Sequence, residues 1–391
     1  MSEWKKVKLD DCLELITYGF TNPMPDTLSG PWKVTAKDIN NGRIVFETAR
    51  HTSQEAFDND LTDKSRPKKG DILLTKDGTL GRLAIVGDER VCINQSVALL
   101  RVNKDILSVP YLYYLLSTPL YQAKMIADAG GAAIKHIYIT RVNQLLIPCP
   151  SYDEQCRIAN ILSRYDSLIE NYQKQIKLLE EAAQRLYKEW FVNLHFPGHE
   201  NTKIVDGVPE GWEKKRLIDL VDVQYGYAFD GKLFNSNGEG MPILRIRNIP
   251  DGTTSDYTTE EASPNYIVHD GDIVVGMDGI FHINSWNGGD AYLVQRACSF
   301  RPKEESTRGF IFQAIQEPIK YFEQTLVGAT VAHLGKKHID SIELIVPANK
   351  DLYIPFQKGF KQRQSLLSQI RLLTEARDRL LPKLMSGEIA V

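Results

Sequence analysis

The chain has 391 residues, a formal net charge of −3 and 42% hydrophobic residues, a composition typical of a globular protein with about two or three domains. It contains no apolar run of about 18 residues, and its first residues are charged rather than apolar, so neither a transmembrane helix nor a signal peptide is expected. Five cysteines without a Cys-x-x-Cys pair are typical of reduced thiols and predict a cytoplasmic protein without a membrane partner.

The charge is unevenly distributed along the chain. Residues 1–150 contain 19 basic and 17 acidic residues, a net charge of +2, whereas residues 198–349 contain 14 and 22, a net charge of −8. The segments 151–197 and 350–391 have net charges of −1 and +4. A strong non-specific attraction between this chain alone and nucleic acid is therefore not expected, and a DNA-binding interpretation must account for the acidic second half.

An internal repeat is the most informative feature of the sequence. Segments beginning at Trp4 and Trp212 share a tryptophan, basic residues, an acidic-apolar stretch and a Tyr-Gly-aromatic ending. A duplicated chain is expected to form two similar units with two similar sites. Later landmarks recur in the same order, since 34–42 matches 244–252, 69–78 matches 270–279, 95–101 matches 295–301, 111–119 matches 310–318 and 177–186 matches 371–380.

Each half of the repeat begins with a block that is predicted to be a compact α/β domain. In both blocks a short apolar run ends in an Asp-Gly turn, at Asp77 and at Asp278, where side chains are available for recognition. The predicted strands lie at 71–74, 83–86, 97–101, 243–246 and 272–275, and the predicted short helices at 111–117 and 310–315.

The first block is followed by the pattern of a long helix. Apolar residues recur every three, four or seven positions over 151–191, which predicts a helix with a broad apolar stripe. Asp153 is the expected N-cap, and Pro197 with Gly198 marks the expected stop. The stripe has two rows, one of Ile158, Ile161, Tyr165, Leu168, Tyr172, Leu179, Ala182 and Leu186, and one of Leu162, Ile169, Ile176, Ala183 and Trp190.

A shorter amphipathic helix is predicted near the C-terminus, closed by Pro382 and Gly387. Two such helices, each following a globular block, can bury their stripes against each other as an antiparallel coiled coil. The alternative is that each helix packs only onto its own block. A helix of about 40 residues is about 60 Å long, more than the width of such a block, which argues against the alternative. The apolar positions of the second helix are Phe360, Leu366, Ile370, Leu373, Leu380 and Leu384.

Enzyme motifs are missing or incomplete. The chain has no Pro-Pro dipeptide, and therefore not the Asn/Asp-Pro-Pro-aromatic tetrad of amino-methyltransferases. Residues 226–233 come close to a phosphate-binding loop, but Leu233 occupies the position of the Mg²⁺-binding hydroxyl. The cysteines and histidines that flank the long helix have the order of zinc ligands, yet the helix is expected to separate them. We therefore expect a non-catalytic chain without a metal or cofactor of its own.

The arrangement of these motifs resembles the specificity subunit of type I restriction-modification systems. The resemblance rests on two globular blocks that are each followed by a helical block, on YDEQCRIANILSRYDSLIE (152–170) and on RLLPKLMSGEI (379–389). The second helical block departs from the pattern, because IPFQKGFKQRQ (354–364) lacks the Glu-Gln-x-x-Ile-Ala of the first copy. This departure puts the symmetry of the two helical blocks in question.

The resemblance implies an α+β fold with a pseudo-two-fold internal repeat, in which two similar α/β target recognition domains are separated by two long helices packed as an antiparallel coiled coil. The implied domains are a first recognition domain (1–150), a central helical spacer (151–195), a second recognition domain (196–349) and a C-terminal helical spacer (350–391). Each recognition domain is expected to read one half of a bipartite DNA target. The helices are expected to set the gap between the halves and to dock methyltransferase subunits.

The resemblance also implies partners and cofactors. The expected partners are double-stranded DNA, two modification (methyltransferase) subunits and two restriction (translocase-endonuclease) subunits. S-adenosylmethionine, ATP and Mg²⁺ are expected on those subunits, so that the complex, not this chain, methylates adenine and cleaves DNA. Two alternatives stay open, namely the recognition subunit of a related system with a fused methylase-nuclease, and a protein-protein adaptor that binds no DNA.

Direct base readout favours Arg or Lys on guanine, Asn or Gln on adenine, and acids on cytosine. For each candidate the structural alternative is a role in a turn or in the core. The first-block candidates for DNA binding are Tyr18, Lys76, Asp77, Thr79, Arg82, Lys135 and His136. The second-block candidates are Tyr225, Tyr227, Arg245, Arg247, Asn248, Asp278, His333, Lys336 and Lys337.

Two experiments follow from the sequence. Replacement of Lys336 and Lys337 by alanine is expected to weaken DNA binding and to flatten its dependence on salt. A four-residue insertion within 165–185 is expected to lengthen the recognised gap without changing either half of the target.

Overall fold

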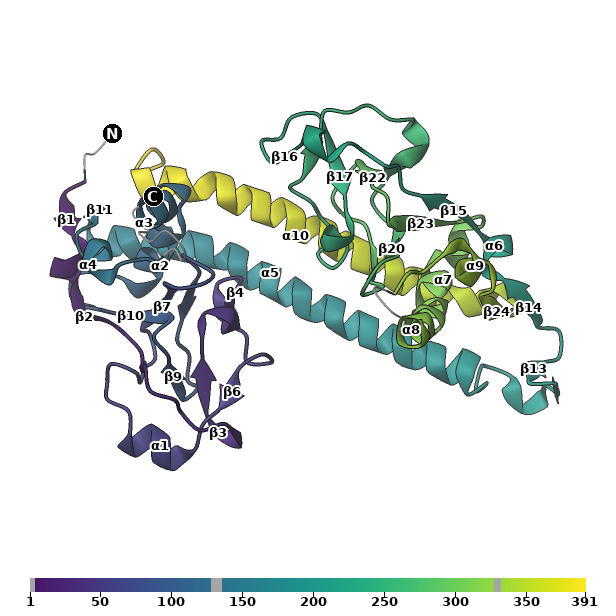
Figure 1. Cartoon of the computed structure of the whole chain (residues 1–391), viewed down its shortest axis with the longest axis horizontal. Helices are drawn as coiled ribbons and strands as arrows, with labels where there is room; N and C mark the ends of the chain where they lie inside the picture. The colour runs from purple at the N-terminus through teal and green to yellow at the C-terminus, as the bar shows by residue number, and fades with distance from the viewer. Residues whose placement is uncertain (1–3, 128–135, 327–331) are drawn as a thin grey trace. The chain divides into compact units, whose positions relative to one another are not determined.

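The computed structural model describes residues 4–127, 136–326 and 332–391 (Figure 1). The chain forms two compact units, unit 1 with residues 1–168 and 373–391, and unit 2 with residues 169–372. Two long helices, α5 (Tyr152–Tyr187) and α10 (Ile354–Ser386), each contribute one part to unit 1 and the other part to unit 2. Each unit thus combines a globular block with a segment of both helices.

The block of unit 1 is built around a four-stranded antiparallel sheet with the strand order β2-β10-β7-β8. These strands are β2 (Leu13–Tyr18), β10 (Val97–Val102), β7 (Ile72–Thr75) and β8 (Leu83–Ile85). Smaller sheets pair β1 (Lys6–Lys8) with β11 (Leu146–Pro148), β3 (Thr27–Val34) with β6 (Arg50–His51) and β9 (Val91–Ile93), and β4 (Ile39–Asn40) with β5 (Arg43–Ile44). The helices are α1 (Gln54–Asn59), α2 (Val109–Ser117), α3 (Pro119–Ala127) and α4 (Ile139–Val142).

The block of unit 2 repeats this plan with the antiparallel order β15-β23-β20-β21. These strands are β15 (Val221–Tyr225), β23 (Ala297–Pro302), β20 (Ile273–Gly276) and β21 (Ile283–Ser285). Further sheets contain β14 (Glu213–Arg216) with β24 (Glu343–Val346), β12 (Ile204–Val205) with β13 (Val208–Pro209), and β16 (Phe234–Asn235), β18 (Tyr257–Thr258), β17 (Met241–Leu244), β22 (Ala291–Leu293) and β19 (Ile267–Val268) in that order. The helices are α6 (Leu217–Leu220), α7 (Arg308–Ala314), α8 (Gln316–Thr325) and α9 (Lys336–Asp340).

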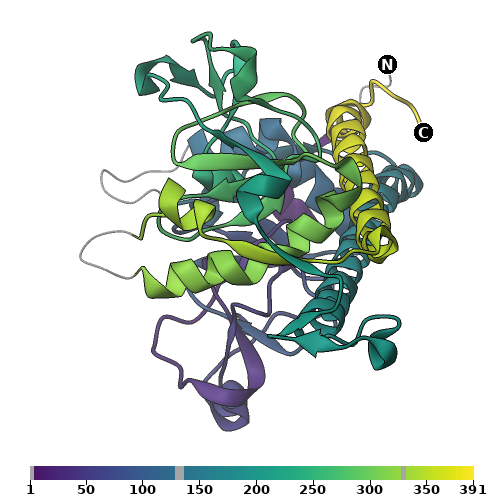
Figure 2. The ribbon, with the colours of Figure 1, turned by 90° about the vertical axis from the view of Figure 1, so that its right-hand side faces the viewer.

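One inner strand of each four-stranded sheet, β7 or β20, is buried on both faces. In β7, Ile72 and Leu74 join one apolar cluster while Leu73 joins another. In β20, alternate residues likewise divide between two clusters, and helices α7 and α8 cover one face through Phe310 and Ile319 (Figure 2). Because successive side chains of a strand point to opposite faces, a fully apolar strand is suited to the centre of such a layered block.

The repeated Tyr-Gly landmark has a structural cause in both units. Gly19 and Gly226 follow β2 and β15, where the backbone passes directly against a neighbouring segment. A Cβ atom on Gly19 would lie 1.8 Å from the carbonyl oxygen of Ile93, and one on Gly226 would lie 2.2 Å from that of Val294. Only glycine allows this close approach, so the repeat retains it.

Helix α5 agrees with the long helix predicted from the sequence, with two corrections. The helix begins at Tyr152, and the Oγ of Ser151 accepts a hydrogen bond from the N–H of Glu154 (3.3 Å), so Ser151 takes the N-cap position predicted for Asp153. The regular α-helix ends at Tyr187 and continues as a π-helical turn, Lys188–Val192. Of the two predicted apolar rows, the one with seven-residue spacing is buried at Leu162, Ile169 and Ile176, whereas the other is buried at Ile158 but 44% exposed at Leu168.

Helix α10 is longer than predicted. It has 33 residues against 36 in α5, and Pro382, predicted to close it, lies inside the helix. Proline in a helix interior removes a backbone hydrogen bond. Here the neighbouring Leu381 and Leu384 are buried in the core of unit 1, which offsets that cost. The helix ends at Ser386, before Gly387 with a φ of 73°.

The two long helices run antiparallel within each unit. In unit 1, Ile158 near the start of α5 shares a core with Leu384 near the end of α10. In unit 2, the ring of Tyr187 at the end of α5 lies 6.3 Å from that of Phe356 near the start of α10. The alternative that each helix packs only onto its own block is therefore wrong, because the last turns of α10 belong to unit 1. The predicted α+β class with duplicated blocks and paired helices is confirmed.

The start of α10 retains one hydrogen bond that the start of α5 makes to its own unit. In unit 1 the buried amide of Gln155 accepts a hydrogen bond from the N–H of Ser108, at the N-terminus of α2 (2.8 Å). In unit 2 Gln357 accepts one from the N–H of Gly309, in the first turn of α7 (2.9 Å). Of the first copy's Glu-Gln-x-x-Ile-Ala motif, the second copy therefore retains only the glutamine, with Phe356 in the place of Glu154.

Within the described ranges, no helix is both long and apolar enough to cross a membrane.

Candidate functional site

Four residues predicted from the first block come together at the end of β7. Asp77 follows this strand, and its Oδ1 forms a short contact with Nδ1 of His136. Its Oδ2 accepts a hydrogen bond from Nζ of Lys76 (2.7 Å). The same Nζ lies 5.5 Å from the ring centre of Tyr18, within the range of a cation-π interaction. A backbone bridge also joins Asp77 to His136, so two distant segments of the chain meet at one carboxylate.

The environment keeps Asp77 ionised. Partial burial raises the pKa of Asp77, but hydrogen bonds from His136 and Lys76 outweigh that effect, so the pKa lies below its ordinary value of 3.8. The carboxylate therefore carries its charge at neutral pH. A charged aspartate with two side-chain partners can orient both of them on a surface.

Unit 2 contains the same arrangement at the end of β20. Oδ1 of Asp278 lies 2.5 Å from Nδ1 of His333, and a backbone bridge joins the two residues as in unit 1. The other carboxylate oxygen, Oδ2, forms an ion pair with Nη1 of Arg296 (3.2 Å). Both units therefore place an aspartate between a histidine and a basic side chain.

The basic side chain comes from a different position in each unit. In unit 2 the place of Lys76 is taken by Met277, which is 7% exposed, while Arg296 stands where unit 1 has Ser96. Ser96 instead donates a hydrogen bond from Oγ to Oδ1 of Asn94 (2.6 Å). The repeat has kept the Asp-His contact and changed the source of the positive charge.

Arg296 was missed in the sequence, although the match of 95–101 with 295–301 sets it against Ser96. Its backbone has a φ of 73°, in the left-handed region, where a residue other than glycine costs about 1–2 kcal/mol. Its side chain is 59% exposed. Strained backbone positions are concentrated at functional sites, which makes this exposed arginine a candidate for a role in binding.

The other first-block candidates lie near this cluster in the sequence but have different surroundings. Thr79 is exposed in the turn after β7. Nη1 of Arg82 donates a hydrogen bond to the carbonyl oxygen of Ile39 at the start of β4 (3.1 Å), so part of this guanidinium is engaged within the block. Lys135 lies outside the described residues.

Three second-block candidates surround the segment after β17. The side-chain oxygen of Asn248 accepts the backbone N–H of Arg245 (2.9 Å), a turn that Asp38 makes with Thr35 in unit 1 at the same distance. The guanidinium of Arg245 lies 5.3 Å from the ring centre of Phe234. These contacts shape the loop and leave Arg245 half-buried.

Arg247 is the third candidate in this segment, and its side chain is exposed. It forms a bidentate ion pair with Asp256, at 3.1 Å from Nε to Oδ2 and 2.5 Å from Nη2 to Oδ1. The hydrogen bonds that Arg247 donates to Asp256 raise the pKa of Arg247 and hold the pKa of Asp256 below its ordinary value. The pair is thus ionised and presents a fixed arginine at the surface.

The remaining second-block candidates divide between the interior and the surface. Burial raises the pKa of Tyr225 to about 12, and its side chain packs against the core of unit 2. The ring of Tyr227 lies 4.8 Å from that of Phe229 and 5.2 Å from that of Tyr266. Lys336 and Lys337 are exposed in the first turn of α9, a few residues after His333 in the chain.

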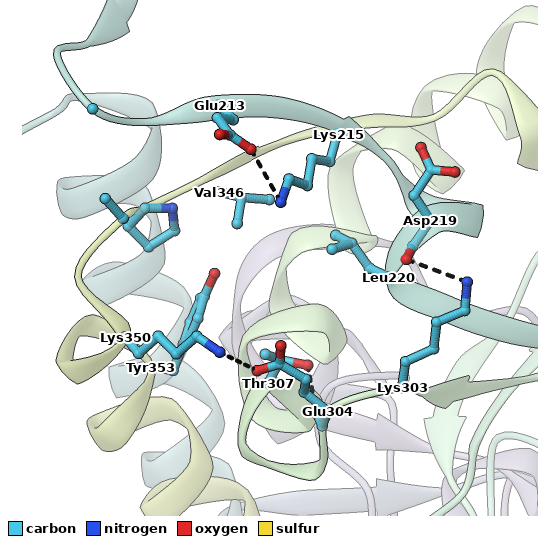
Figure 3. Close-up of a pocket in the computed structure, with 13 residues that line it drawn as sticks. Glu213, Lys215, Asp219, Leu220, Lys303, Glu304, Thr307, Val346, Lys350 and Tyr353 are labelled. Atoms are coloured by element: carbon cyan, nitrogen blue, oxygen red, sulfur yellow. Dashed lines mark hydrogen bonds and ion pairs between the residues drawn. The ribbon is translucent and has the colours of Figure 1, made fainter.

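A cavity of about 530 Å³ in unit 2 contains none of the candidate residues (Figure 3). Three lysines face it, and each has an acceptor in its wall. Lys350 pairs with Glu304 (2.7 Å) and Lys215 with Glu213 (3.0 Å). Lys303 donates from Nζ to the carbonyl oxygen of Asp219 (3.3 Å). These internal pairs explain the polar lining without a bound ligand. Within the described residues, no group of three or more His, Cys, Asp or Glu side chains is placed to hold a metal ion.

Comparison with known proteins gives matches to the specificity proteins of type I restriction systems. The sequence model of the type I restriction modification DNA specificity domain matches residues 1–181 and 209–367. The chain is 27% identical over 380 residues to the specificity subunit of the type I restriction enzyme MjaIX of Methanocaldococcus jannaschii, covering 92% of this chain and 87% of that protein. It is 25% identical over 416 residues to the MjaVIII specificity subunit of the same organism, covering 100% and 93%.

A solved structure has the same fold. The crystal structure of an S subunit of a type I restriction-modification system from M. genitalium superposes with a TM-score of 0.58 at 19% identity, covering 98% of this chain and 96% of the other. The sequence model matches two segments, one in each half of the repeat, and together they contain most of the chain. The chain therefore belongs to the type I restriction-modification DNA specificity family.

Proposed function

We propose that this chain is the DNA-recognition subunit of a type I restriction-modification complex and that each globular block reads one half of a bipartite target. The observation that carries the proposal is the recurrence of one Asp-His contact after the equivalent inner strand, β7 or β20, of the four-stranded sheet in each unit. The basic residue beside it differs, with Lys76 in unit 1 and Arg296 in unit 2. A conserved scaffold with different basic residues is suited to two different half-sites.

The proposed DNA-facing residues keep the sets chosen from the sequence. Exposed basic groups such as Lys336, Lys337 and Arg247 would contact phosphates or guanine edges, and the half-buried residues would act by shaping the loops. The proposed set for unit 1 is Tyr18, Lys76, Asp77, Thr79, Arg82, Lys135 and His136. The proposed set for unit 2 is Tyr225, Tyr227, Arg245, Arg247, Asn248, Asp278, His333, Lys336 and Lys337.

The helices have a second proposed role. Segments 151–195 and 350–391 would act as spacers that set the gap between the half-sites and dock two modification subunits. The segments 1–150 and 196–349 would be the recognition domains. Helices of 36 and 33 residues are about 50 Å long, comparable to about one and a half turns of DNA at roughly 34–36 Å per turn.

The proposal leaves the chemistry to partner subunits in the cytoplasm. Two modification subunits would supply S-adenosylmethionine and the methyl transfer to adenine, and two restriction subunits would supply the ATP- and Mg²⁺-dependent steps. The net charge of −8 over 198–349 fits this division, because the partners would neutralise most of the phosphate charge while base contacts stay local.

The test is co-expression of this chain with the modification subunit encoded beside it, followed by genome-wide mapping of methylated adenines. The proposal predicts one asymmetric motif with two specified halves and a fixed unspecified gap. A contiguous motif, or no methylation by a correctly assembled complex, would contradict it. Measured binding to DNA, with or without the modification subunit, would exclude the adaptor alternative. The neighbouring genes would show whether methylase and nuclease are encoded separately or as one fused protein.

A further inference from the structure

We infer that Arg296 is a specificity-determining residue of unit 2 that contacts a guanine edge, and that Asp278 and His333 are the residues that position it. The inference rests on the proposed function and deepens it by assigning one base contact to one side chain. Arg296 is not among the candidates chosen from the sequence, and the family resemblance assigned it no role.

The geometry leaves most of the arginine available. Asp278 engages one guanidinium nitrogen, Nη1, at 3.2 Å, while the side chain is 59% exposed. A guanidinium has five N–H donors in a planar fork, so several donors remain for a second acceptor. The carboxylate is itself fixed on its other oxygen by His333 at 2.5 Å. The histidine and aspartate thus limit where the arginine can point.

The backbone supports a role in binding. Of the described residues other than glycine, four have a positive φ, and Arg296 has the largest value, 73°. Glycine would take this conformation without strain. The long arginine side chain is kept at a position where glycine would be more stable, and strain of this kind is concentrated at ligand-binding sites.

The comparison between the units points to a base contact rather than to a general structural ion pair. Unit 1 satisfies the equivalent Asp77 with Lys76, and its residue at the position of Arg296 is Ser96, which turns inward to Asn94. A structural need for a cation would be met equally well by a lysine at the original position. Both side chains can contact O6 and N7 of guanine, but lysine does so as a compact point charge and arginine as a planar fork of five donors. The exchange therefore changes the chemistry that each unit offers to DNA.

The test uses the complete complex with its modification subunit and a variant that should not impair folding, Arg296→Gly. Glycine keeps the left-handed turn and removes the guanidinium. Methylation rates are measured on a panel of duplexes that carry every single-base change in both half-sites. Arg296→Gln is the second variant. The matched control is Arg216→Gln, which removes a similarly exposed arginine (56%) from a 3.0 Å ion pair with Asp219.

The expected result is a loss of discrimination of about tenfold to a hundredfold at one G·C pair of one half-site, with the other half-site unchanged. Lys76→Gln should change the other half-site, and Arg216→Gln should change neither. Unchanged discrimination at every position in Arg296→Gly, with or without a lower melting temperature, would overturn the inference. If the wild-type complex recognises no bipartite motif, the proposed function fails, and the inference fails with it.

Discussion

Arg377 on α10 donates a hydrogen bond from Nη1 to Oδ1 of Asp166 on α5 (2.7 Å), and the hydroxyl of Tyr114 in α2 donates to Oδ2 of the same carboxylate (2.5 Å). Unit 2 contains a second interhelical pair, from Nε of Arg363 on α10 to Oε1 of Glu180 on α5 (2.6 Å). The two pairs are separated by 14 residues on each helix. In each unit, one ion pair therefore fixes the register of the antiparallel helices.

The Arg363–Glu180 pair should couple strongly in a double-mutant cycle. The side chain of Arg363 is 9% exposed, so Glu180→Gln leaves a nearly buried charge without its carboxylate. We expect a loss of about 2 kcal/mol, below the value for a fully buried pair because Glu180 is 37% exposed, or about 4–8 °C in melting temperature. Removal of both charges in Glu180→Gln/Arg363→Met should cost less than the sum of the single changes.

Thermal unfolding of the full chain measures this coupling. Glu170→Gln serves as the control, because Glu170 is 54% exposed and pairs along its own helix with Lys174. Additivity of the two single changes to within about 0.5 kcal/mol would show that the pair does not fix the register.

The two glutamines at the helix starts should differ in their contribution to stability. Gln155 is fully buried and also donates from Nε2 to the carbonyl oxygens of Pro150 (3.0 Å) and Ile106 (3.2 Å). Gln155→Leu leaves these groups and the Ser108 N–H without a partner and should cost about 3 kcal/mol. Gln357 is less buried, so Gln357→Leu should cost about 1 kcal/mol.

Melting temperatures of the two variants test this order, with Gln173→Leu on the exposed side of α5 as the control. An equal loss for Gln155→Leu and Gln357→Leu would mean that the additional hydrogen bonds of Gln155 contribute nothing.

The sequence predicted the parts of the fold that depend on local pattern. Strands such as β7 and β20 and the buried seven-residue row of α5 follow from apolar periodicity and were predicted close to their observed bounds. Pro382 was misjudged because burial of Leu381 and Leu384 in unit 1 overrides the helix-breaking tendency of proline. Tertiary contacts of this kind have no signature in a local sequence window.

The candidate site was predictable in part. Asp77 and Asp278 were selected because each follows a buried strand in an Asp-Gly turn, and His136 and His333 were selected separately. Their direct contact could not be predicted, because 59 and 55 residues separate the partners. Arg296 was not selected at all, since the matching position in the first copy is a serine. A basic residue that occupies different positions in the two repeats is not found by a comparison that looks for matching residues.

The pH dependence of stability should reveal the Asp77 contact. Because the pKa of Asp77 is lowered in the folded chain, its stabilisation is fully present above the ordinary pKa of 3.8 and is lost as the pH falls through the lowered value. Between those two values the unfolded chain binds the proton more readily, so stability rises with pH there. We expect Asp77→Asn to flatten the dependence of the melting temperature of unit 1 on pH below about 5.

Melting curves of wild type and Asp77→Asn at closely spaced acidic pH values provide this measurement. Asp10→Asn, a change of an exposed carboxylate in the same unit, is the control. Parallel curves for wild type and Asp77→Asn would show that Asp77 gains nothing from His136 and Lys76.

The central claim, that two recognition units are spaced by a helix pair, is tested most directly by lengthening both helices together. Seven residues inserted in α5 between Asp166 and Glu180, and seven in α10 between Arg363 and Arg377, keep both ion pairs and the seven-residue apolar row. Seven residues add about 10 Å, or about three base pairs. Mapping of methylated adenines should therefore give two unchanged half-sites with a gap longer by about three base pairs. An unchanged gap, or an altered half-site, would contradict the account.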